Sequence, residues 1–182
     1  NGDGTFTEHA ALYTGSHSQL VLIAVGDFNN DNHVDIAITN IYARNIAVGD
    51  FNSDNRLDVV FSYRTRYSMG IMFGHGNGSF GDIMKFYTAA TRTYSAIVVV
   101  DFNDDSHLDI VFYRYDPESV DILLGDGKGQ RQTLFSVEIC YDVAPLLVGD
   151  FNGDGDQDII SIVLDPPSFN VLLNTSGCCT AQ

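Results

Sequence analysis

The sequence predicts an all-β fold assembled from repeats of one small unit, and three observations support this prediction. Nearly the same nine residues occur four times, as DFNNDNHVD, DFNSDNRLD, DFNDDSHLD and DFNGDGDQD, beginning at Asp27, Asp50, Asp101 and Asp150. Short runs rich in β-branched and aromatic residues flank every copy, which is typical of β-strands. No segment keeps a 3.6-residue periodicity, so we expect little helix.

The first expected element of each unit is a hairpin closed by the nine-residue loop. An apolar run precedes each loop and a second apolar run follows it. Runs of this length that are bounded by Asp, Asn and Gly predict paired strands. The expected pairs are Leu20–Asp27 with Val34–Thr39, Ile46–Asp50 with Leu57–Tyr63, Ile97–Asp101 with Leu108–Tyr113, and Leu146–Asp150 with Ile159–Leu164.

The second expected element is a strand that enters a glycine-rich turn, followed by a strand that leaves it. Gly70–Phe80 (GIMFGHGNGSF) and Val120–Gly129 (VDILLGDGKG) carry this pattern in full. Phe169–Asn174 looks like the start of another copy, and Asn1–Phe6 (NGDGTF) looks like the end of one. The full unit therefore has four strands, the last of which are expected at Phe80–Tyr87, Thr133–Ile139 and Phe6–Tyr13.

The spacing of the loops suggests the blades of a β-propeller. Asp50 and Asp101 are 51 residues apart, and Asp101 and Asp150 are 49 apart. A four-stranded sheet recurring at this period is typical of radial β repeats. Asp27 and Asp50 are only 23 residues apart, so one blade lacks about half of its strands, at about five residues per strand. A genuine deletion, a skipped coding segment and a mispredicted chain are all open explanations.

We therefore expect residues 1–182 to form one β-propeller domain with about four blades. The blades are expected at residues 20–45 (truncated), 46–90, 96–139 and 144–174. A strand within residues 5–14 would complete the last sheet and close the ring. The same phasing would result if the chain were an excerpt of a larger propeller, and both alternatives stay open. Because the chain begins without Met or a signal peptide, we expect it to be a piece of a longer protein.

The charge of the chain is concentrated in the four loops. The net charge is −15, and 14 of the 24 acidic residues lie in the nine-residue repeats. Nucleic acids and anionic membranes are recognised by basic patches, so neither is an expected partner. The apolar runs are too short to span a bilayer, so no membrane span is expected in this segment.

The loop pattern predicts calcium sites. Oxygen-bearing side chains occupy the first, third, fifth and ninth places, and the backbone carbonyl of the seventh place completes the set. Carboxylate, amide and carbonyl oxygens are what Ca²⁺ prefers, with six to eight ligands, so we expect up to four structural Ca²⁺ ions. The predicted ligands are Asp27, Asn29, Asp31, His33 and Asp35; Asp50, Asn52, Asp54, Arg56 and Asp58; Asp101, Asn103, Asp105, His107 and Asp109; and Asp150, Asn152, Asp154, Asp156 and Asp158.

Other loop positions carry structural expectations. The second-place phenylalanines and the apolar eighth-place residues should point away from the ion and pack between sheets. The sixth place should be left-handed, and Ser106 is the residue least suited to that backbone. Asp- and Asn-rich turns also occur in hairpins without metal, but four in register favour metal binding. An EF-hand is disfavoured because no loop has Glu at the twelfth place.

The hairpin VGDFN…D…LDIV followed by LLGxGxG resembles the FG-GAP/VCBS repeat, the calcium-bearing blade of integrin α-subunit propellers. This resemblance implies a β-propeller, calcium in the first loop of each blade, and a non-catalytic role in adhesion or ligand recognition. Two alternatives are a lectin-like propeller and an accessory propeller of a secreted lyase or hydrolase. Tyrosines after the second strands, such as Tyr63 and Tyr113, could form a recognition surface but are more simply core residues.

Several weaker signals favour an extracellular or cell-surface protein. Asn77 and Asn174 begin tripeptides that fit the N-glycosylation pattern. Weak calcium modules operate outside cells. Of three cysteines, Cys178 and Cys179 are adjacent, so either could pair with Cys140. The expected partner is an extracellular protein or glycan. The glycine runs lead into strands rather than helices, so they do not predict a nucleotide site.

Overall fold

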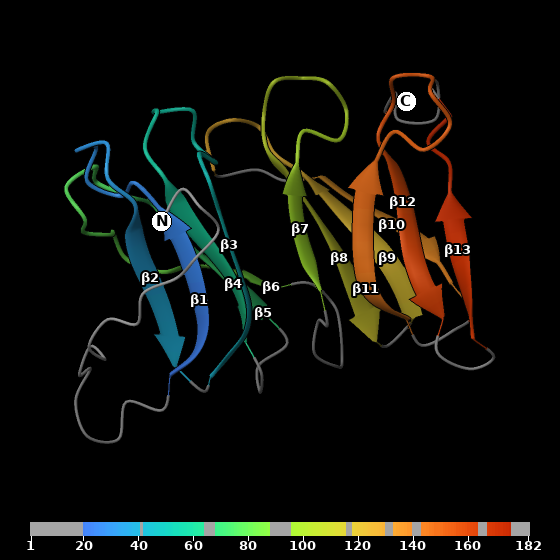
Figure 1. The fold of residues 1–182 in the computed structure, drawn as a ribbon, viewed down its shortest axis with the longest axis horizontal. Coiled ribbons are helices and arrows are strands. Elements are labelled where there is room, and N and C mark those ends of the chain that lie inside the picture. The colour runs from blue at the N-terminus through green and yellow to red at the C-terminus, as the bar shows by residue number, and fades with distance from the viewer. Residues whose placement is uncertain are drawn as a thin grey trace, which may run out of the picture.

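The structure is a computed structural model, and it describes residues 20–40, 42–63, 68–87, 96–115, 118–129, 133–139, 143–163 and 167–175. In these parts the chain is all β, as predicted: thirteen strands form four antiparallel sheets and no helix occurs (Figure 1). The sheets are consistent with propeller-like blades. Strands neighbouring in sequence pair with each other, so each sheet is a meander.

We number the sheets as blades in chain order. Blade 1 is β1 (Leu20–Gly26) and β2 (Asp35–Asn40). Blade 2 is β3 (Ala43–Gly49), β4 (Asp58–Tyr63), β5 (Ser68–Met72) and β6 (Met84–Tyr87). Blade 3 is β7 (Ile97–Val100), β8 (Asp109–Tyr115), β9 (Glu118–Leu124) and β10 (Thr133–Glu138). Blade 4 is β11 (Val143–Gly149), β12 (Asp158–Val163) and β13 (Ser168–Leu172).

The strands differ from the sequence expectation mainly around the glycine turns. The fourth strand of blade 2 begins at Met84 and not at Phe80. Phe80 instead forms an isolated bridge with Gly74, and the Gly81 amide donates to the Phe73 carbonyl at 2.8 Å. These bonds extend the turn by several residues. The strand expected at Phe6–Tyr13 and all three cysteines lie outside the described residues.

The blades form a row in which the first strand of each blade lies beside the first strand of the next (Figure 1). β1 contacts β3, β3 contacts β7, and β7 contacts β11. Within the described chain, blade 1 and blade 4 occupy opposite ends of this row, and no closed barrel is formed. The sheets therefore meet face to face.

The hydrophobic core lies between blades and is divided into three clusters. Phe28, Val59 and Phe61 form the cluster between blades 1 and 2. Between blades 2 and 3 the cluster includes Phe51, Val60, Met69, Ile71, Ile110 and Phe112. Between blades 3 and 4 it includes Phe102, Val111, Tyr113, Val120, Leu146 and Ile159. Because an inner blade packs on both sides, its second strand is buried on both faces.

The loop phenylalanines fit this arrangement. Phe28, Phe51 and Phe102 are buried, which confirms their expected packing between sheets, whereas Phe151 of blade 4 is 47% exposed. Val34, an eighth-place residue, was also expected to pack between sheets, and this expectation is wrong because Val34 is 73% exposed. Both exceptions occur on a terminal blade, on the face that has no neighbouring sheet in the described chain.

Candidate metal centre

The four nine-residue loops connect the first and second strands of their blades, and they lie along one edge of the row (Figure 1, top). All twenty predicted ligand residues lie in these loops and within the described chain. Each loop has nearly the same hydrogen-bond network, built from aspartate and asparagine side chains and the backbone amides between them. The repeat in the sequence is therefore a repeat in local structure.

The first-place aspartate closes each loop. In the first loop, Asp27 Oδ1 accepts the Asp31 amide at 3.1 Å and Asp27 Oδ2 accepts the Asn32 amide at 2.8 Å. One side chain thus holds two amides from the far side of the turn. Asp50 and Asp101 make equivalent pairs of bonds. Asp150 accepts the sixth-place Gly155 amide in the same way, but its Oδ1 accepts the fourth-place Gly153 amide.

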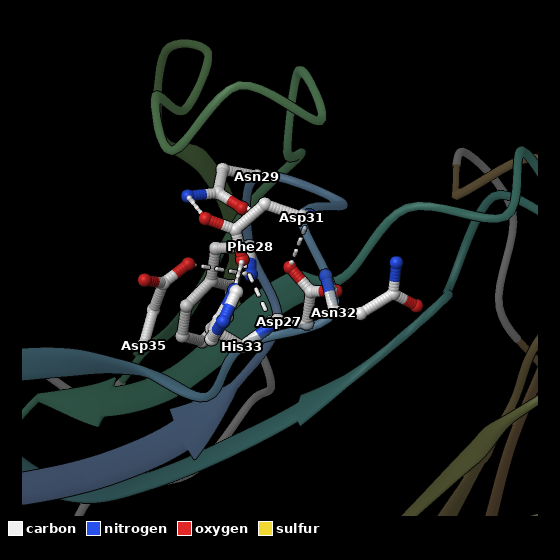
Figure 2. Close-up of polar contacts among 7 residues, drawn as sticks. All are labelled: Asp27, Phe28, Asn29, Asp31, Asn32, His33 and Asp35. Carbon is white, nitrogen blue, oxygen red and sulfur yellow. Dashed lines mark hydrogen bonds and ion pairs between the residues drawn. The ribbon is translucent and has the colours of Figure 1, made fainter.

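The third and fifth places are joined to each other. Asn29 Nδ2 donates to Asp31 Oδ2 at 3.0 Å, and the His33 amide donates to Asp31 Oδ1 at 2.8 Å. Figure 2 shows the Asn29 and Asp31 side chains together on one side of the loop, with the Asp35 carboxylate reaching the Phe28 amide. The same third-to-fifth bond recurs in the other loops at 3.1, 3.0 and 2.8 Å.

The loop backbone turns through two left-handed residues in every copy. The sixth-place residues have positive φ in all four loops, including Ser106 at 68°, so the expected left-handed backbone is confirmed even there. The fourth places are also left-handed, which the sequence analysis did not predict. Asn and Gly tolerate this region better than Ser or bulky residues do. The fourth-place residues are Asn30, Ser53, Asp104 and Gly153.

In blades 2, 3 and 4, the ninth-place aspartate accepts hydrogen bonds both from its own loop and from the end of the third strand of its blade. Asp109 is fully buried, and its two oxygens accept the Phe102 amide at 2.8 Å and the Gly125 amide at 2.7 Å. The second amide comes from the end of the third strand, so one carboxylate joins the loop to the rest of the sheet. Gly125 is required there because a β-carbon would collide with the Leu108 carbonyl. Asp58 and Asp158 form equivalent bonds.

The pKa values of the buried and the exposed loop carboxylates shift in opposite directions. Burial raises the pKa of Asp58 to about 6, although the Gly74 and Phe51 amides act against that rise. Burial likewise raises the pKa of Asp109. On the exposed side, the His33 amide lowers the pKa of Asp31 and the Gly153 amide lowers the pKa of Asp150. At Asp58 and Asp109, burial therefore disfavours the charged form of the ninth-place carboxylate.

The loops suit a hard divalent cation in donor type and backbone shape. Side-chain donors at the first, third, fifth and ninth places offer oxygen, and the left-handed pairs wrap the chain tightly around them. In the described residues, however, no three His, Cys, Asp or Glu side chains converge in an arrangement that would hold a metal. Asparagine side chains and backbone carbonyls make up part of the predicted ligand set, and a group of His, Cys, Asp and Glu side chains does not include them.

Two seventh-place side chains touch fifth-place carboxylates. His33 Nδ1 lies 3.1 Å from Asp31 Oδ1, and Arg56 Nη1 lies 4.0 Å from Asp54 Oδ2. All four groups are substantially exposed, so these pairs contribute little to stability. The basic groups approach the loops from the solvent side.

The repeat is also recognised by comparison with known families. A family model described as an FG-GAP-like repeat matches residues 50–112, which include the second and third loops. Residues 50–112 are therefore similar to an FG-GAP-like repeat. This confirms the resemblance seen in the sequence for that segment, and FG-GAP repeats are modules of protein recognition that are generally non-catalytic. No curated protein matches the chain.

FG-GAP repeats are also typically extracellular. The described part of the chain contains no helix with the length and apolarity needed to cross a membrane. Asn77, one of the two predicted glycosylation residues, is exposed on the glycine turn of blade 2, where Ser79 donates to its side-chain oxygen.

An apolar groove beside β2 was not predicted from the sequence. Its volume is about 680 Å³, and it lies where blade 1 has no third strand in the described chain to cover blade 2. Backbone and side chains of β2 form one wall. Blade 2 and the β2–β3 connection supply the rest of the lining, which includes Tyr42, Phe61, Tyr63, Met72, Phe80 and Ile83. The short interval between Asp27 and Asp50 was the available signal.

Sequence analysis also missed a buried ion pair in blade 3. Arg114 Nε lies 2.9 Å from Asp121 Oδ2, and Ser119 Oγ donates to Asp121 Oδ1 at 2.8 Å. Tyr113, named above as a surface candidate, is fully buried in the cluster between blades 3 and 4, so its core interpretation holds. Tyr63 lines the groove.

Proposed function

We propose that the protein is an extracellular or cell-surface recognition module whose blades are stabilised by calcium bound in the four nine-residue loops. The shared network of the four loops supports this proposal. Four copies place the same oxygen donors at the same positions and fold the same left-handed pairs around them. A turn that had only to reverse the chain would not need four acidic or amide side chains each time.

Calcium supplies charge neutralisation in this proposal. The loops contain 14 of the acidic residues of a chain with a net charge of −15, and four Ca²⁺ ions would reduce that charge to −7. The residues that hold each ion are the first-, third-, fifth- and ninth-place side chains with the seventh-place carbonyl. Extracellular calcium is abundant enough to fill modules of modest affinity.

Asp105→Ala tests the sites individually. We expect the variant to bind one Ca²⁺ ion fewer than the wild type, because it removes the fifth-place carboxylate from the third loop only. Blades contact only their neighbours, so the other loops should keep their affinity. Isothermal titration of calcium into protein stripped of metal measures the stoichiometry.

The matched control for this experiment is Asp82→Ala, which removes an exposed carboxylate outside the four loops. It should leave the stoichiometry unchanged. Equal stoichiometry in the wild type and Asp105→Ala, or no saturable binding by the wild type, would contradict the calcium sites.

For the recognition surface, the groove beside β2 is the best candidate. Its volume of about 680 Å³ is in the range of ligand sites, and its lining is mainly apolar. β2 pairs only with β1 in the described chain, so its other edge offers backbone groups for an added strand. An extended segment of a protein ligand would pair with β2 and place apolar side chains over Phe61 and Met72.

A peptide that copies a third strand of this chain tests the groove. In blade 3 the third strand is β9, so we expect a labelled ESVDILLG peptide (residues 118–125) to bind saturably in fluorescence polarisation. Ile83→Asp should weaken binding at least tenfold, because Ile83 lines the groove and is exposed. Val137→Asp, an exposed position on β10, is the matched control.

The peptide with methylated alternate amides should not bind, because backbone pairing would be lost. Equal binding of the methylated and unmodified peptides, or no effect of Ile83→Asp, would show that the groove does not accept a strand.

A further inference from the structure

The packing between blades uses the same positions at each of the three internal interfaces. One blade contributes the face of its first two strands that includes the eighth-place residue. For blade 2 this face comprises Ile46, Val48, Leu57, Val59 and Phe61, which pack in the cluster shared with blade 1. For blade 3 it comprises Ile97, Val99, Leu108, Ile110 and Phe112, and for blade 4 it includes Leu146, Val148 and Ile159. We call this the leading face of a blade.

The preceding blade contributes the opposite face, which we call the trailing face. It contains the second-place phenylalanine and alternate residues of the second and third strands. In blade 2 these are Phe51, Val60, Met69 and Ile71, all buried against the leading face of blade 3. In blade 3 they are Phe102, Val111, Tyr113, Val120 and Ile122, which are buried against blade 4.

A leucine and a glycine mark the fit of the two faces. A β-carbon at Gly26 on blade 1 would lie only 2.5 Å from Leu57 Cδ1 on blade 2. One at Gly49 on blade 2 would collide with Leu108 Cδ1 on blade 3 in the same way. The glycine before the first and the second loop is therefore a notch for the eighth-place leucine of the next blade. Between blades 3 and 4 both members change, to Val100 and Gln157.

Blade 1 exposes a complete leading face. Each of its members corresponds to a residue that is packed in blades 2 and 3: Ile23 to Ile46, for example, and Val34 to Leu57. Val34 is 73% exposed and Ile23 is 66% exposed. The exposed members are Ile23, Val25, Val34, Ile36 and Ile38.

Blade 4 exposes a complete trailing face at the other end of the row (Figure 1). Phe169 pairs with Ile162 as Met69 pairs with Ser62, yet Met69 is fully buried and Phe169 is 67% exposed. At Gly149 an added β-carbon would meet only the ring of Phe151 of the same loop, at 3.5 Å or more, so the notch is open. The exposed members are Leu147, Phe151, Ile162, Phe169, Val171 and Leu173.

We propose that copies of this chain associate head to tail, with the leading face of blade 1 on the trailing face of blade 4 and Val34 in the notch at Gly149. The two exposed faces are the two halves of an interface that the chain already forms three times internally. Clusters of exposed apolar side chains rather than single ones mark interaction sites. If two leading faces met, their eighth-place side chains would face each other with no notch to enter. The contact is therefore heterologous and joins unlike ends of two copies.

Sedimentation velocity of the full chain, over a range from about 1 µM to about 1 mM at physiological salt, measures the association. Salt screens the repulsion between copies that each carry a charge of −15. We expect the sedimentation coefficient to rise with concentration. Ile23→Asp, which breaks the leading face, and Gly149→Leu, which fills the notch, should each weaken association at least tenfold.

The direction of the contact is tested by mixing the two variants. Ile23→Asp keeps the notch at Gly149, and Gly149→Leu keeps the leading face of blade 1, so an equimolar mixture should form dimers although neither variant does alone. Val137→Asp, the same chemical change on the exposed face of β10, should associate like the wild type. Melting curves confirm that every variant is folded.

A wild-type chain that remains monomeric throughout the concentration range would overturn the proposal, as would association that both variants leave unchanged. Variants that fail alone and also fail when mixed would overturn the head-to-tail geometry, because a symmetric contact would then be the better description. None of these readouts requires calcium, so the outcome is independent of the proposed metal sites.

Discussion

Removing calcium with a chelator should lower the melting temperature of this protein by about 10–20 °C, and adding calcium back should restore it. The cause is electrostatic. Each loop gathers three or four carboxylates on one short turn. Among the described residues, the ion pairs made with these carboxylates are the exposed contacts of His33 with Asp31 and of Arg56 with Asp54. A dication among them replaces mutual repulsion with attraction.

The expected size follows from linkage. A ligand present at 100 times its dissociation constant stabilises the folded state by about 2.7 kcal/mol per site. For a chain of 150–250 residues, each kcal/mol shifts the melting temperature by about 2–4 °C. Two filled sites, at about 5.4 kcal/mol together, therefore account for the whole range, and further sites would extend it. Differential scanning calorimetry with and without chelator provides the measurement.

Magnesium at the same concentration is the control for a general salt effect. It should restore much less stability, because it requires stricter octahedral geometry and loses water reluctantly. Identical melting curves with calcium and with chelator would show that the four loops are stable without an ion.

Replacing Asp109 by alanine should reduce the free energy of unfolding by about 4 kcal/mol even when calcium is absent. Asp109 is fully buried, and its carboxylate is the acceptor for the Phe102 and Gly125 amides. Each buried amide left without an acceptor costs about 1–3 kcal/mol. Urea unfolding in the presence of a chelator measures the loss without any contribution from metal.

Asp35→Ala is the matched comparison for this variant. Asp35 accepts the Phe28 amide, and the described part of blade 1 has no third strand whose end could donate a second amide. Its loss should therefore be about half as large. Asp82→Ala, at an exposed position, should change stability by less than about 0.5 kcal/mol. If Asp109→Ala is destabilised only when calcium is present, the carboxylate acts through the ion and not through the two amides.

The strand–loop–strand repeat could be predicted because its signals are local. Each nine-residue copy lies between two apolar runs, and β1, β4, β8 and β12 lie within two residues of their expected starts. The glycine turns were located, but the start of β6 was not, because the bonds that delay it join Gly74 to Phe80 and Gly81 to Phe73 across the turn. Such pairings depend on the folded turn and not on composition.

What the sequence could not reveal depends on neighbours in space. The second role of Asp109 requires an amide sixteen residues away at the end of β9. The burial of Arg114 beside Asp121 requires two adjacent strands whose polar residues face each other. Likewise, Val34 and Leu57 share a place in the repeat, yet within the described residues only Leu57 packs against a preceding blade.

The division of the core into clusters that each belong to two adjacent sheets has a consequence for synthesis on the ribosome. No described blade has a hydrophobic core of its own, so the smallest unit that can bury its apolar side chains is a pair of adjacent blades. The side of blade 1 that packs on blade 2 therefore stays solvated until blade 2 has left the exit tunnel. Each later blade can pack against a preceding blade that has already folded, so assembly of these blades proceeds from blade 1 toward blade 4.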